Sequence, residues 1–349
     1  MRFNVRIVRS YVEHCSPHRR AVQDAQEEGE LGVALLQDPG SVDSQLLAHV
    51  GRHTHKLWDW DAFPASKGYP ELARAQMRYI GAGGSPKVGD TSTLPPSCFT
   101  CSLIYLDSPR YAAAHSHEIE EVFWVHTGRL TVTWELDGEW VDVLLGPGDA
   151  LLNPADIVHG FRNEGPEPVV AQFMVGHPKP LLPKYRYHPS SGDAGPEFGR
   201  PLPDAAHLQA RWMSQYVMRA SEISTHWVTF ADGGRLAHQR YVFPRAHGGA
   251  VDPGHYSLEM VQLLTGTYSP WFRATYETAF MVWSGVLAVD WQNENERDQS
   301  TVHLGPRDLV QIPAGQAFRL ANHGAEIARA AIMIGTPTPP DDLWRATVE

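Results

Sequence analysis

Short runs of apolar residues, often alternating with polar ones and separated by turn residues, recur along this chain of 349 residues. Residues 130–145 contain two runs rich in β-branched and aromatic side chains around Asp137-Gly138, a dipeptide typical of a two-residue hairpin turn. Residues 168–176 and 327–335 are mostly apolar, as in strands that are buried on both faces. The pattern predicts a fold dominated by β-strands, in a barrel or a sandwich.

The two halves of the sequence resemble each other. Three segments of the first half match segments of the second: 120–134 matches 277–291, 145–163 matches 304–322, and the residues around Arg78 match those around Arg240. The first pair lies 157 positions apart and the second 159, so the second copy has two extra residues. They fall in the polar stretch 292–300, which is typical of a hairpin loop. Duplication of one domain is the simplest explanation.

The repeat and the composition together predict the domain organisation. We expect an N-terminal extension of mixed structure (1–95), a first barrel (96–177), a linker with a helix (178–225) and a second barrel (226–340). The linker is dense in Pro, Gly and Ser, and the helix is expected after it, with Asp204 as its N-cap. Residues 2–8 alternate like a strand that either completes a barrel or pairs with another subunit.

One group of polar residues in the first half is spaced for metal binding. His115, His117 and Glu121 have the same parity, so on extended backbone their side chains point to one face. His159 follows a turn and would reach the same place from another strand. Three imidazoles and one carboxylate suit Fe, Mn, Ni, Cu, Co or Zn, and an octahedral ion would keep two positions for water, oxygen or substrate.

The spacing of these residues resembles the two-part signature of the cupin superfamily. The two parts are His115-x-His117-x3-Glu121-x6-Gly128 and Gly148-x5-Pro154-x4-His159-x3-Asn163. The resemblance implies two double-stranded β-helix (jelly-roll) barrels in tandem, with a few helices, and one divalent transition metal per chain, Fe or Mn being favoured. One position departs from the signature, because Asp156 stands where the family usually has Gly. Asp is tolerated in turns and sometimes in the left-handed region, so the change concerns the loop more than the ligands.

The second copy lacks all four ligands. The matching positions hold Phe272, Ala274, Thr278 and Phe318, none of which binds a transition metal well. Glu277 is close by, but it matches Glu120 and not Glu121, so it would face away. We therefore expect the second barrel to be structural.

Other site residues can be proposed only by strand parity. Phe123 and Val125 continue the face of Glu121, and Phe161 continues the face of His159. They would give the substrate pocket an apolar wall. Tyr105 and Gln172 are candidates to donate or accept hydrogen bonds from neighbouring strands, and each fits equally well as a core or surface residue.

Tandem barrels with one intact and one degenerate site resemble bicupins of the gentisate and quercetin dioxygenase type. The glutamate ligand brings the site closer to quercetin dioxygenases and oxalate decarboxylases than to gentisate dioxygenases. The resemblance implies an oxidoreductase, a dioxygenase that acts on a small aromatic or β-dicarbonyl compound. The alternatives are a non-oxidative isomerase, cyclase or decarboxylase, and a non-enzymatic protein that binds or senses a small molecule.

Composition narrows the choice of partners. The net charge of −11 disfavours nucleic acid and anionic membranes, and no apolar stretch approaches the roughly 20 residues of a membrane span. The only cysteines are Cys15, Cys98 and Cys101, which favours a reducing cytoplasm over a disulfide-stabilised protein.

We expect a homodimer or a larger even assembly, since pairing would cover the edge strands of the barrels.

Overall fold

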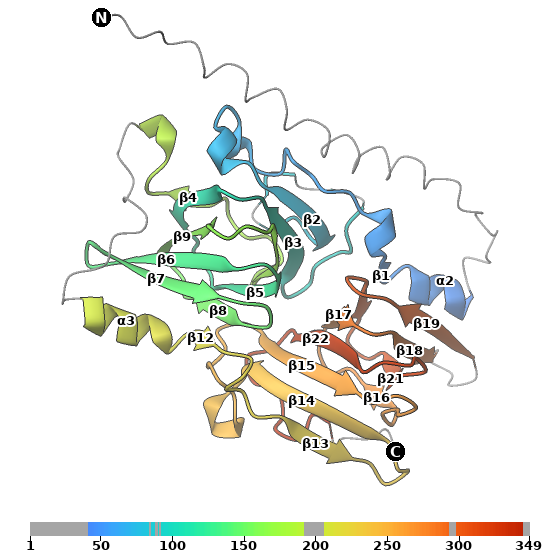
Figure 1. Cartoon of the computed structure of the whole chain (residues 1–349). Helices are drawn as coiled ribbons and strands as arrows, with labels where there is room; N and C mark the ends of the chain where they lie inside the picture. Colours follow the sequence, from blue (N-terminus) through green and yellow to red (C-terminus); the bar gives the residue numbers. More distant parts are fainter. Residues whose placement is uncertain are drawn as a thin grey trace, which may run out of the picture. The chain divides into compact units, whose positions relative to one another are not determined.

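Most of the described residues lie in β-strands, as the alternation predicts. The computed structural model describes residues 41–83, 85–87, 90, 92–191, 206–292 and 298–344. They form two jelly-roll barrels in tandem, the first mostly teal to green and the second mostly orange to red in Figure 1. Residues 2–8 and Asp204, for which a strand and an N-cap are expected, lie outside the described residues.

The first barrel consists of two sheets. One contains, in spatial order, β12 (Val217–Met218), β8 (Ala150–Asn153), β5 (Glu121–Thr127), β10 (Val169–Val175), β3 (Thr100–Leu106) and β2 (Ala75–Ile80). The other contains β11 (Lys184–Tyr185), β4 (Arg110–Ser116), β9 (Val158–Asn163), β6 (Leu130–Leu136) and β7 (Glu139–Leu145).

The second barrel repeats this order of strands. Its larger sheet contains β1 (Val50–Gly51), β20 (Leu309–Ile312), β17 (Thr278–Ser284), β22 (Ala328–Ile334), β15 (Ser257–Leu263), β14 (Arg235–Val242) and β13 (His226–Thr229). Its smaller sheet contains β16 (Phe272–Arg273), β21 (Ala317–Ala321), β18 (Leu287–Gln292) and β19 (Gln299–Leu304). The pairing of β18 with β19 confirms the predicted hairpin around residues 292–300.

Each barrel also receives a short strand from outside its own repeat. β1 pairs with β20 of the second barrel, although β2, which follows it in the chain, pairs with β3 of the first. In turn, β12 pairs with β8 of the first barrel, and the strands that follow it belong to the second. Part of the segment before residue 95 is thus built into the sheets, while the exact domain boundaries stay predictions.

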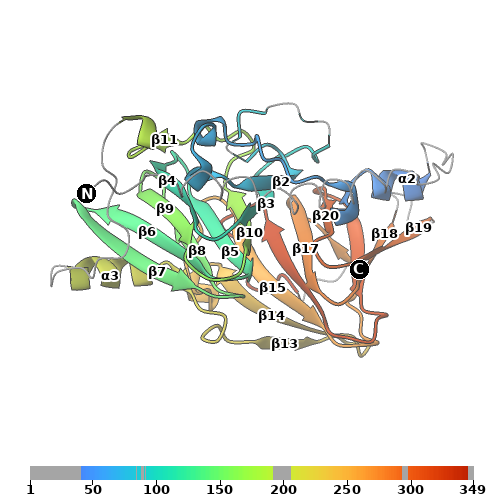
Figure 2. The same ribbon diagram turned by 45° about the horizontal axis from the view of Figure 1, so that its top comes forward.

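The helices are few and short. They are α2 (Val42–Leu47), α3 (Ala206–Ser214) and the single-turn 3₁₀ helices η1 (His53–His55), η2 (Pro64–Ser66), η3 (Pro70–Leu72), η4 (Pro189–Ser191) and η5 (Arg245–His247). Figure 2 shows α2 beside β18 and β19, and α3 beside β7. α3 is the expected linker helix, and the short strand β12 follows it. None of the helices in the described part of the chain has the length and apolar character to cross a membrane.

Two turns show how local sequence fixes the backbone. Asp137 and Gly138 have φ angles of 53° and 81°, which is the left-handed pair of a type I′ turn, and they join β6 to β7 as predicted. Asp156 also lies in the left-handed region, with φ of 62°, and the matching Gly315 has φ of 88°. The N–H of Asp156 donates to the carbonyl of His117 at 2.7 Å, so the loop keeps its shape without glycine.

Three apolar cores hold the structure together. One fills the first barrel around Phe123 and Trp134, and a second fills the second barrel around Phe280 and Trp291. The third contains residues of both barrels, including Trp124. The two barrels are therefore joined by an apolar core of their own.

Two matching glutamates tie the barrels together from opposite sides. Glu120 of the first barrel accepts a hydrogen bond from the N–H of His255 at 2.7 Å and lies 2.5 Å from its Nδ1. Glu277 of the second barrel accepts from the N–H of Ser97 at 3.1 Å and from that of Cys98 at 2.7 Å. Glu277 thus faces away from the interior of its barrel, as predicted, and serves the contact between the barrels.

The interior of the second barrel is filled where the first has its polar group. Phe272 lies opposite Phe318 on the neighbouring strand, just as His115 lies opposite His159. The two phenyl centroids are 5.9 Å apart, and Trp344 packs against Phe272 at 5.5 Å. Ala274 and Thr278, at the other two matching positions, are also buried. The ligand positions have become part of an apolar core.

Truncating Phe318 should measure how much this apolar core contributes to the stability of the protein. Phe318 is 4% exposed, so Phe318→Ala should lower the free energy of unfolding by about 3–5 kcal/mol through lost burial and the cavity left behind. Urea unfolding followed by circular dichroism gives this value. Trp227→Ala, which removes a ring that is 50% exposed, should change it by about 0.5 kcal/mol or less. Equal effects of the two substitutions would contradict the assignment.

Glu277→Ala tests the contact between the barrels. The substitution leaves the N–H groups of Ser97 and Cys98 without their acceptor, and it should cost about 1–3 kcal/mol of unfolding free energy. The exposed Glu167, changed to Ala, is the matched control and should have little effect. A Glu277→Ala protein as stable as this control would show that the contact contributes nothing.

Candidate metal centre

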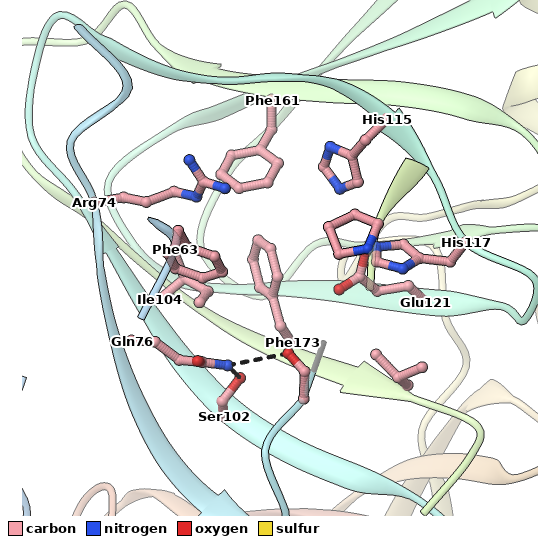
Figure 3. A pocket seen from close by; sticks show the side chains of 13 residues that line it. Phe63, Arg74, Gln76, Ser102, Ile104, His115, His117, Glu121, Phe161 and Phe173 are labelled. Carbon is pink, nitrogen blue, oxygen red and sulfur yellow. Dashed lines mark hydrogen bonds and ion pairs between the residues drawn. The ribbon is translucent and has the colours of Figure 1, made fainter. Parts of the chain in front are cut away.

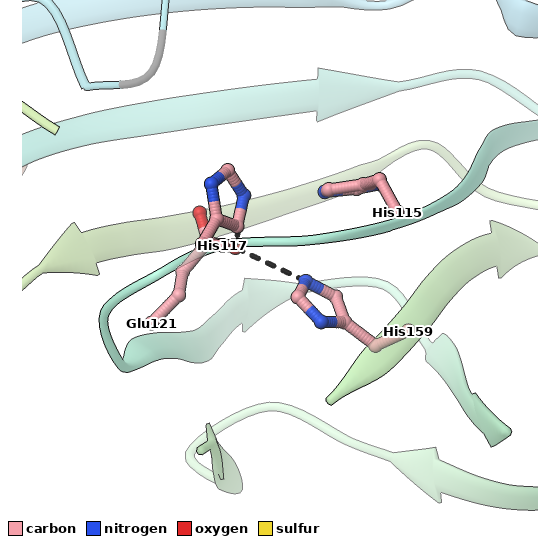
Figure 4. Close-up of side chains that lie close together, drawn as sticks. All are labelled: His115, His117, Glu121 and His159. Carbon is pink, nitrogen blue, oxygen red and sulfur yellow. Dashed lines mark hydrogen bonds and ion pairs between the residues drawn. The ribbon is translucent and has the colours of Figure 1, made fainter. Parts of the chain in front are cut away.

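The four side chains that the sequence predicts as ligands lie together inside the first barrel (Figure 4). His115 is on β4, His117 follows it by two residues, Glu121 begins β5, and His159 is on β9. A bulge in β4 between Ala112 and His115 shifts the register there, so that His115 pairs with His159. Bulges often redirect a side chain in this way next to functional sites.

The potential ligand atoms converge on one point. One atom from each residue lies within 4.8 Å of the others, and all four residues are buried. Oε2 of Glu121 is 3.4 Å from Nε2 of His117 and 3.3 Å from Nε2 of His159. The arrangement brings three imidazole nitrogens and one carboxylate oxygen to a single site.

Backbone carbonyls set the orientation of two of the rings. Nδ1 of His115 is 2.7 Å from the carbonyl of Ala113, and Nδ1 of His159 is 2.9 Å from that of Ile157. Because a carbonyl only accepts, each Nδ1 must carry the proton and donate it. In the neutral rings, Nε2 then keeps its lone pair, which is the form that binds a metal.

The electrostatics of the group are consistent with this assignment. Burial alone would raise the pKa of Glu121, but the charge of His117 and the close contacts of the carboxylate with His117 and His159 hold that pKa well below its usual range. Burial lowers the pKa of His115, and the His159 and His117 rings lower it further. Burial also lowers the pKa of His117, but the Glu121 carboxylate outweighs it and raises that pKa. A charged carboxylate and a neutral His115 are the protonation states that metal binding needs, whereas His117 has to give up its extra proton when an ion binds.

The donor set fits a divalent transition metal. Nδ1 of His117 is buried and has no hydrogen-bond partner, so the protein alone does not satisfy this group of residues. Within the described ranges, no other three or more His, Cys, Asp or Glu side chains come together in this way. Imidazole and carboxylate ligands suit several first-row metals and do not select one.

A small cavity of about 30 Å³ lies beside the metal site (Figure 3). It is lined by Phe63, Arg74, Gln76, Gly83, Ser102, Ile104, His115, His117, Glu121, Phe161, Phe173, Val175 and Pro183. Three phenylalanines form much of the wall, and Arg74, Gln76 and Ser102 add polar groups away from the metal ligands. This is the usual make-up of a small-molecule pocket.

Of the three residues expected in the pocket wall, Phe161 lines the cavity and the other two do not. Phe123 is fully buried behind it, with its ring stacked on Phe173 at 4.0 Å and 5.7 Å from the ring of His159. Val125 lies further along the same strand, in the barrel core. Phe123 therefore supports the pocket wall from inside and does not line it.

The two hydrogen-bonding candidates lie away from the cavity. The hydroxyl of Tyr105 donates to Asp107 at 2.8 Å, and its ring contacts Trp58. Gln172 is fully buried, with its amide nitrogen 3.4 Å from the sulfur of Met333 in the second barrel. Neither residue is in the pocket lining, so their placement gives no support to a catalytic role.

Sequence reasoning missed the residues that the N-terminal segment contributes. Phe63, Arg74 and Gln76 line the cavity, although all three precede the predicted barrel. The one available signal was the repeat around Arg78 and Arg240, which shows that a strand precedes each barrel.

Comparison with known families identifies the first barrel. Residues 106–176 match the model of the cupin domain, a segment that contains all four metal-site residues. The first barrel is therefore a cupin domain. A search of curated proteins found no significant match.

Solved structures with two such barrels are similar in fold to the whole chain. The oxalate decarboxylase formate complex of Lactobacillus farciminis has a TM-score of 0.53 at 12% identity, and the match covers 76% of this chain and 82% of that chain. Vicilin from hazelnut (Corylus avellana) has a TM-score of 0.54 at 12% identity, covering 82% and 85%. The oxalate decarboxylase of Bacillus subtilis, which has Mn(II) centres, has a TM-score of 0.55 at 11% identity, covering 87% and 80%. At these identities the likeness concerns the fold, which is that of a bicupin.

Removing one imidazole should empty the site. His117→Ala deletes one of three imidazole ligands and should weaken metal binding, so the variant should lose most of its bound metal during purification. Metal content per chain is measured by mass spectrometry after purification without a histidine tag. His303→Ala, which changes an exposed histidine of β19 in the second barrel, should keep one metal per chain. Full occupancy in His117→Ala, or two metals per wild-type chain, would contradict the assignment.

Proposed function

We propose that this bicupin is a metal-dependent enzyme that acts on a small, oxygen-rich organic compound in the first barrel. The observation that carries the proposal is that His115, His117 and Glu121 form part of the cavity wall. A compound in the cavity therefore lies beside the metal ligands. A divalent transition metal held there would supply Lewis-acid or redox chemistry to oxygen atoms of the substrate.

The chain itself supplies a dry and narrow environment. Phe63, Phe161 and Phe173 keep water from much of the cavity wall, which strengthens electrostatic interactions inside it. With about 30 Å³ of free space the cavity is narrow, and a flavonoid-sized ring system would not fit. Within the expected substrate classes, this favours a small β-dicarbonyl compound over a bulky aromatic one.

The first candidate reaction is a dioxygenation, in which both atoms of O₂ enter the products of the β-dicarbonyl compound. It is supported by the set of three histidines and one glutamate, together with the resemblance of that set to the one in quercetin dioxygenases. The role of the chain's residues is to bind and orient the substrate and to exclude bulk water.

The second candidate is a non-oxidative reaction, such as a decarboxylation or an isomerisation. It is supported by Arg74, a buried cation in the cavity wall that suits an anionic substrate, and by the likeness in fold to oxalate decarboxylases. In this reaction the positive environment of the pocket stabilises the negative charge that develops on the substrate.

Oxygen consumption separates the two candidates. The protein is loaded in parallel with Fe(II) and Mn(II) and given acetylacetone or acetoacetate in an oxygen electrode, with product analysis by chromatography. A dioxygenase consumes one O₂ per substrate molecule, and a decarboxylase or isomerase forms product at the same rate without O₂. Binding without turnover would instead favour a non-enzymatic binding or sensing protein. The His117→Ala variant is the control, and activity equal to wild type in that variant would contradict the proposal.

A further inference from the structure

Arg74 is a buried cation on the far side of the cavity from the metal ligands. It directly precedes β2, and it is 4% exposed. In Figure 3 its side chain extends into the pocket from the side opposite His115, His117 and Glu121. The cavity therefore lies between a guanidinium group and the candidate metal site.

The protein leaves the charge of Arg74 without a carboxylate partner. Nη1 donates to Oγ of Ser66 at 3.0 Å and to the carbonyl of Leu72 at 3.2 Å, and the guanidinium lies 4.0 Å from the centroid of the Phe63 ring. Its Nε is buried and has no hydrogen-bond partner. Burial lowers the pKa of Arg74, whereas Tyr185 and the Glu121 carboxylate act to raise it, and the guanidinium stays charged at neutral pH. A buried charge of this kind is costly unless an anion joins it.

The other buried arginines that the structure describes all pair with carboxylates. Their partners are Asp59 and Asp90 for Arg78, Asp142 and Glu164 for Arg162, and Glu259 and Asp341 for Arg240. No carboxylate of the described residues forms such a pair with Arg74. Each of these three guanidinium groups is thus neutralised by carboxylates of the protein. Arg74 is the exception.

The internal repeat has an apolar residue in place of this arginine in the barrel that lacks the metal ligands. Arg78 pairs with Ser102 and Arg240 with Glu259, and both strands shift register directly afterwards, so β2 and β14 are equivalent. Arg74 therefore corresponds to Leu236, which is fully buried in the apolar core of the second barrel. The barrel without metal ligands also lacks the cation, which links Arg74 to the function of the pocket and not to the folding of the barrel.

We propose that Arg74 binds a carboxylate of the substrate, and that the substrate is a small carboxylic acid with a second oxygen donor directed at the metal site. The inference deepens the proposed function and rests on it. The planar guanidinium suits a carboxylate, and the aromatic side chains around it exclude competing water.

A pair of ligands that differ in charge tests this on the wild-type protein. Acetoacetate is a β-keto acid, and acetoacetamide is its neutral amide of nearly the same size. Isothermal titration calorimetry on the metal-loaded full chain should show that the acid binds roughly 10- to 100-fold more tightly, as expected for a charge-assisted hydrogen bond in a buried site. Equal affinities would overturn the inference.

Variants then show whether Arg74 is the source of the preference. Arg74→Gln should bind the acid and the amide with similar affinity, and Arg74→Lys, which keeps the charge but not the planar group, should retain part of the preference. Arg162→Gln removes a buried arginine of the same barrel that does not line the cavity, and it should keep the full preference. Metal content and thermal stability are measured on every sample, so that loss of folding is not mistaken for loss of binding.

The outcomes separate this inference from the proposed function. A metal-loaded Arg74→Gln protein that still prefers the acid overturns the role of Arg74 and leaves the metal-dependent function intact. Should Arg74→Gln fail to fold, Arg74→Lys and the wild-type comparison of acid with amide decide the question. A wild-type protein that takes up no metal, or a His117→Ala protein that keeps it, overturns the proposed function and this inference with it.

Discussion

The alternation of side chains across an extended backbone is the constraint on which the site and the two-barrel assembly both depend. Glu120 and Glu121 are neighbours in the sequence, so their side chains leave the backbone on opposite faces. Glu121 points inward, where its carboxylate meets the imidazoles of His117 and His159. Glu120 points outward and binds His255 of the second barrel. One strand end therefore carries both a metal-site residue and a contact between the barrels.

The same parity explains what became of the second copy. Glu277 corresponds to Glu120 and keeps its role, since it binds backbone N–H groups of the first barrel. The inward position next to it is Thr278, which faces an interior filled by Phe272 and Phe318. The outward face remained under the constraint of the contact between the barrels, whereas the inward face was free to become an apolar core once no ion was bound there. A barrel can thus lose its ligands and still support its neighbour.

Features that depend on the local spacing of residues could be predicted from the sequence alone. The hairpin at Asp137-Gly138 and the convergence of His115 with His159 both follow from turn chemistry and strand parity, and the structure contains both. Parity does not reveal which face of a strand is the interior when both faces are apolar. All seven residues of β10 are buried, so nothing in the sequence showed that Phe173 faces the cavity while Gln172 faces the second barrel.

Arg74 was missed for a related reason. It follows a 3₁₀ turn, η3, in a segment without a regular apolar period, and an isolated arginine before a strand has no signature of its own. Only the structure shows that Arg74 is buried without a carboxylate partner and that it lies across the cavity from the metal ligands.

The second barrel helps to fix both sides of the cavity. Arg74 directly precedes β2, β2 pairs with β3, and Glu277 binds the backbone at Ser97 and Cys98, just before β3 begins. On the other side, the contact of Glu120 with His255 fixes the start of β5, where Glu121 lies. Two matching contacts to the barrel that lacks ligands thus lie beside the segments that carry the cation and the metal site. The proposed binding of an anion depends on the distance between the cation and the metal site, because an ion pair weakens as the charges move apart. A second barrel without ligands would then still serve the proposed site, since it contacts the segments on both sides of the cavity.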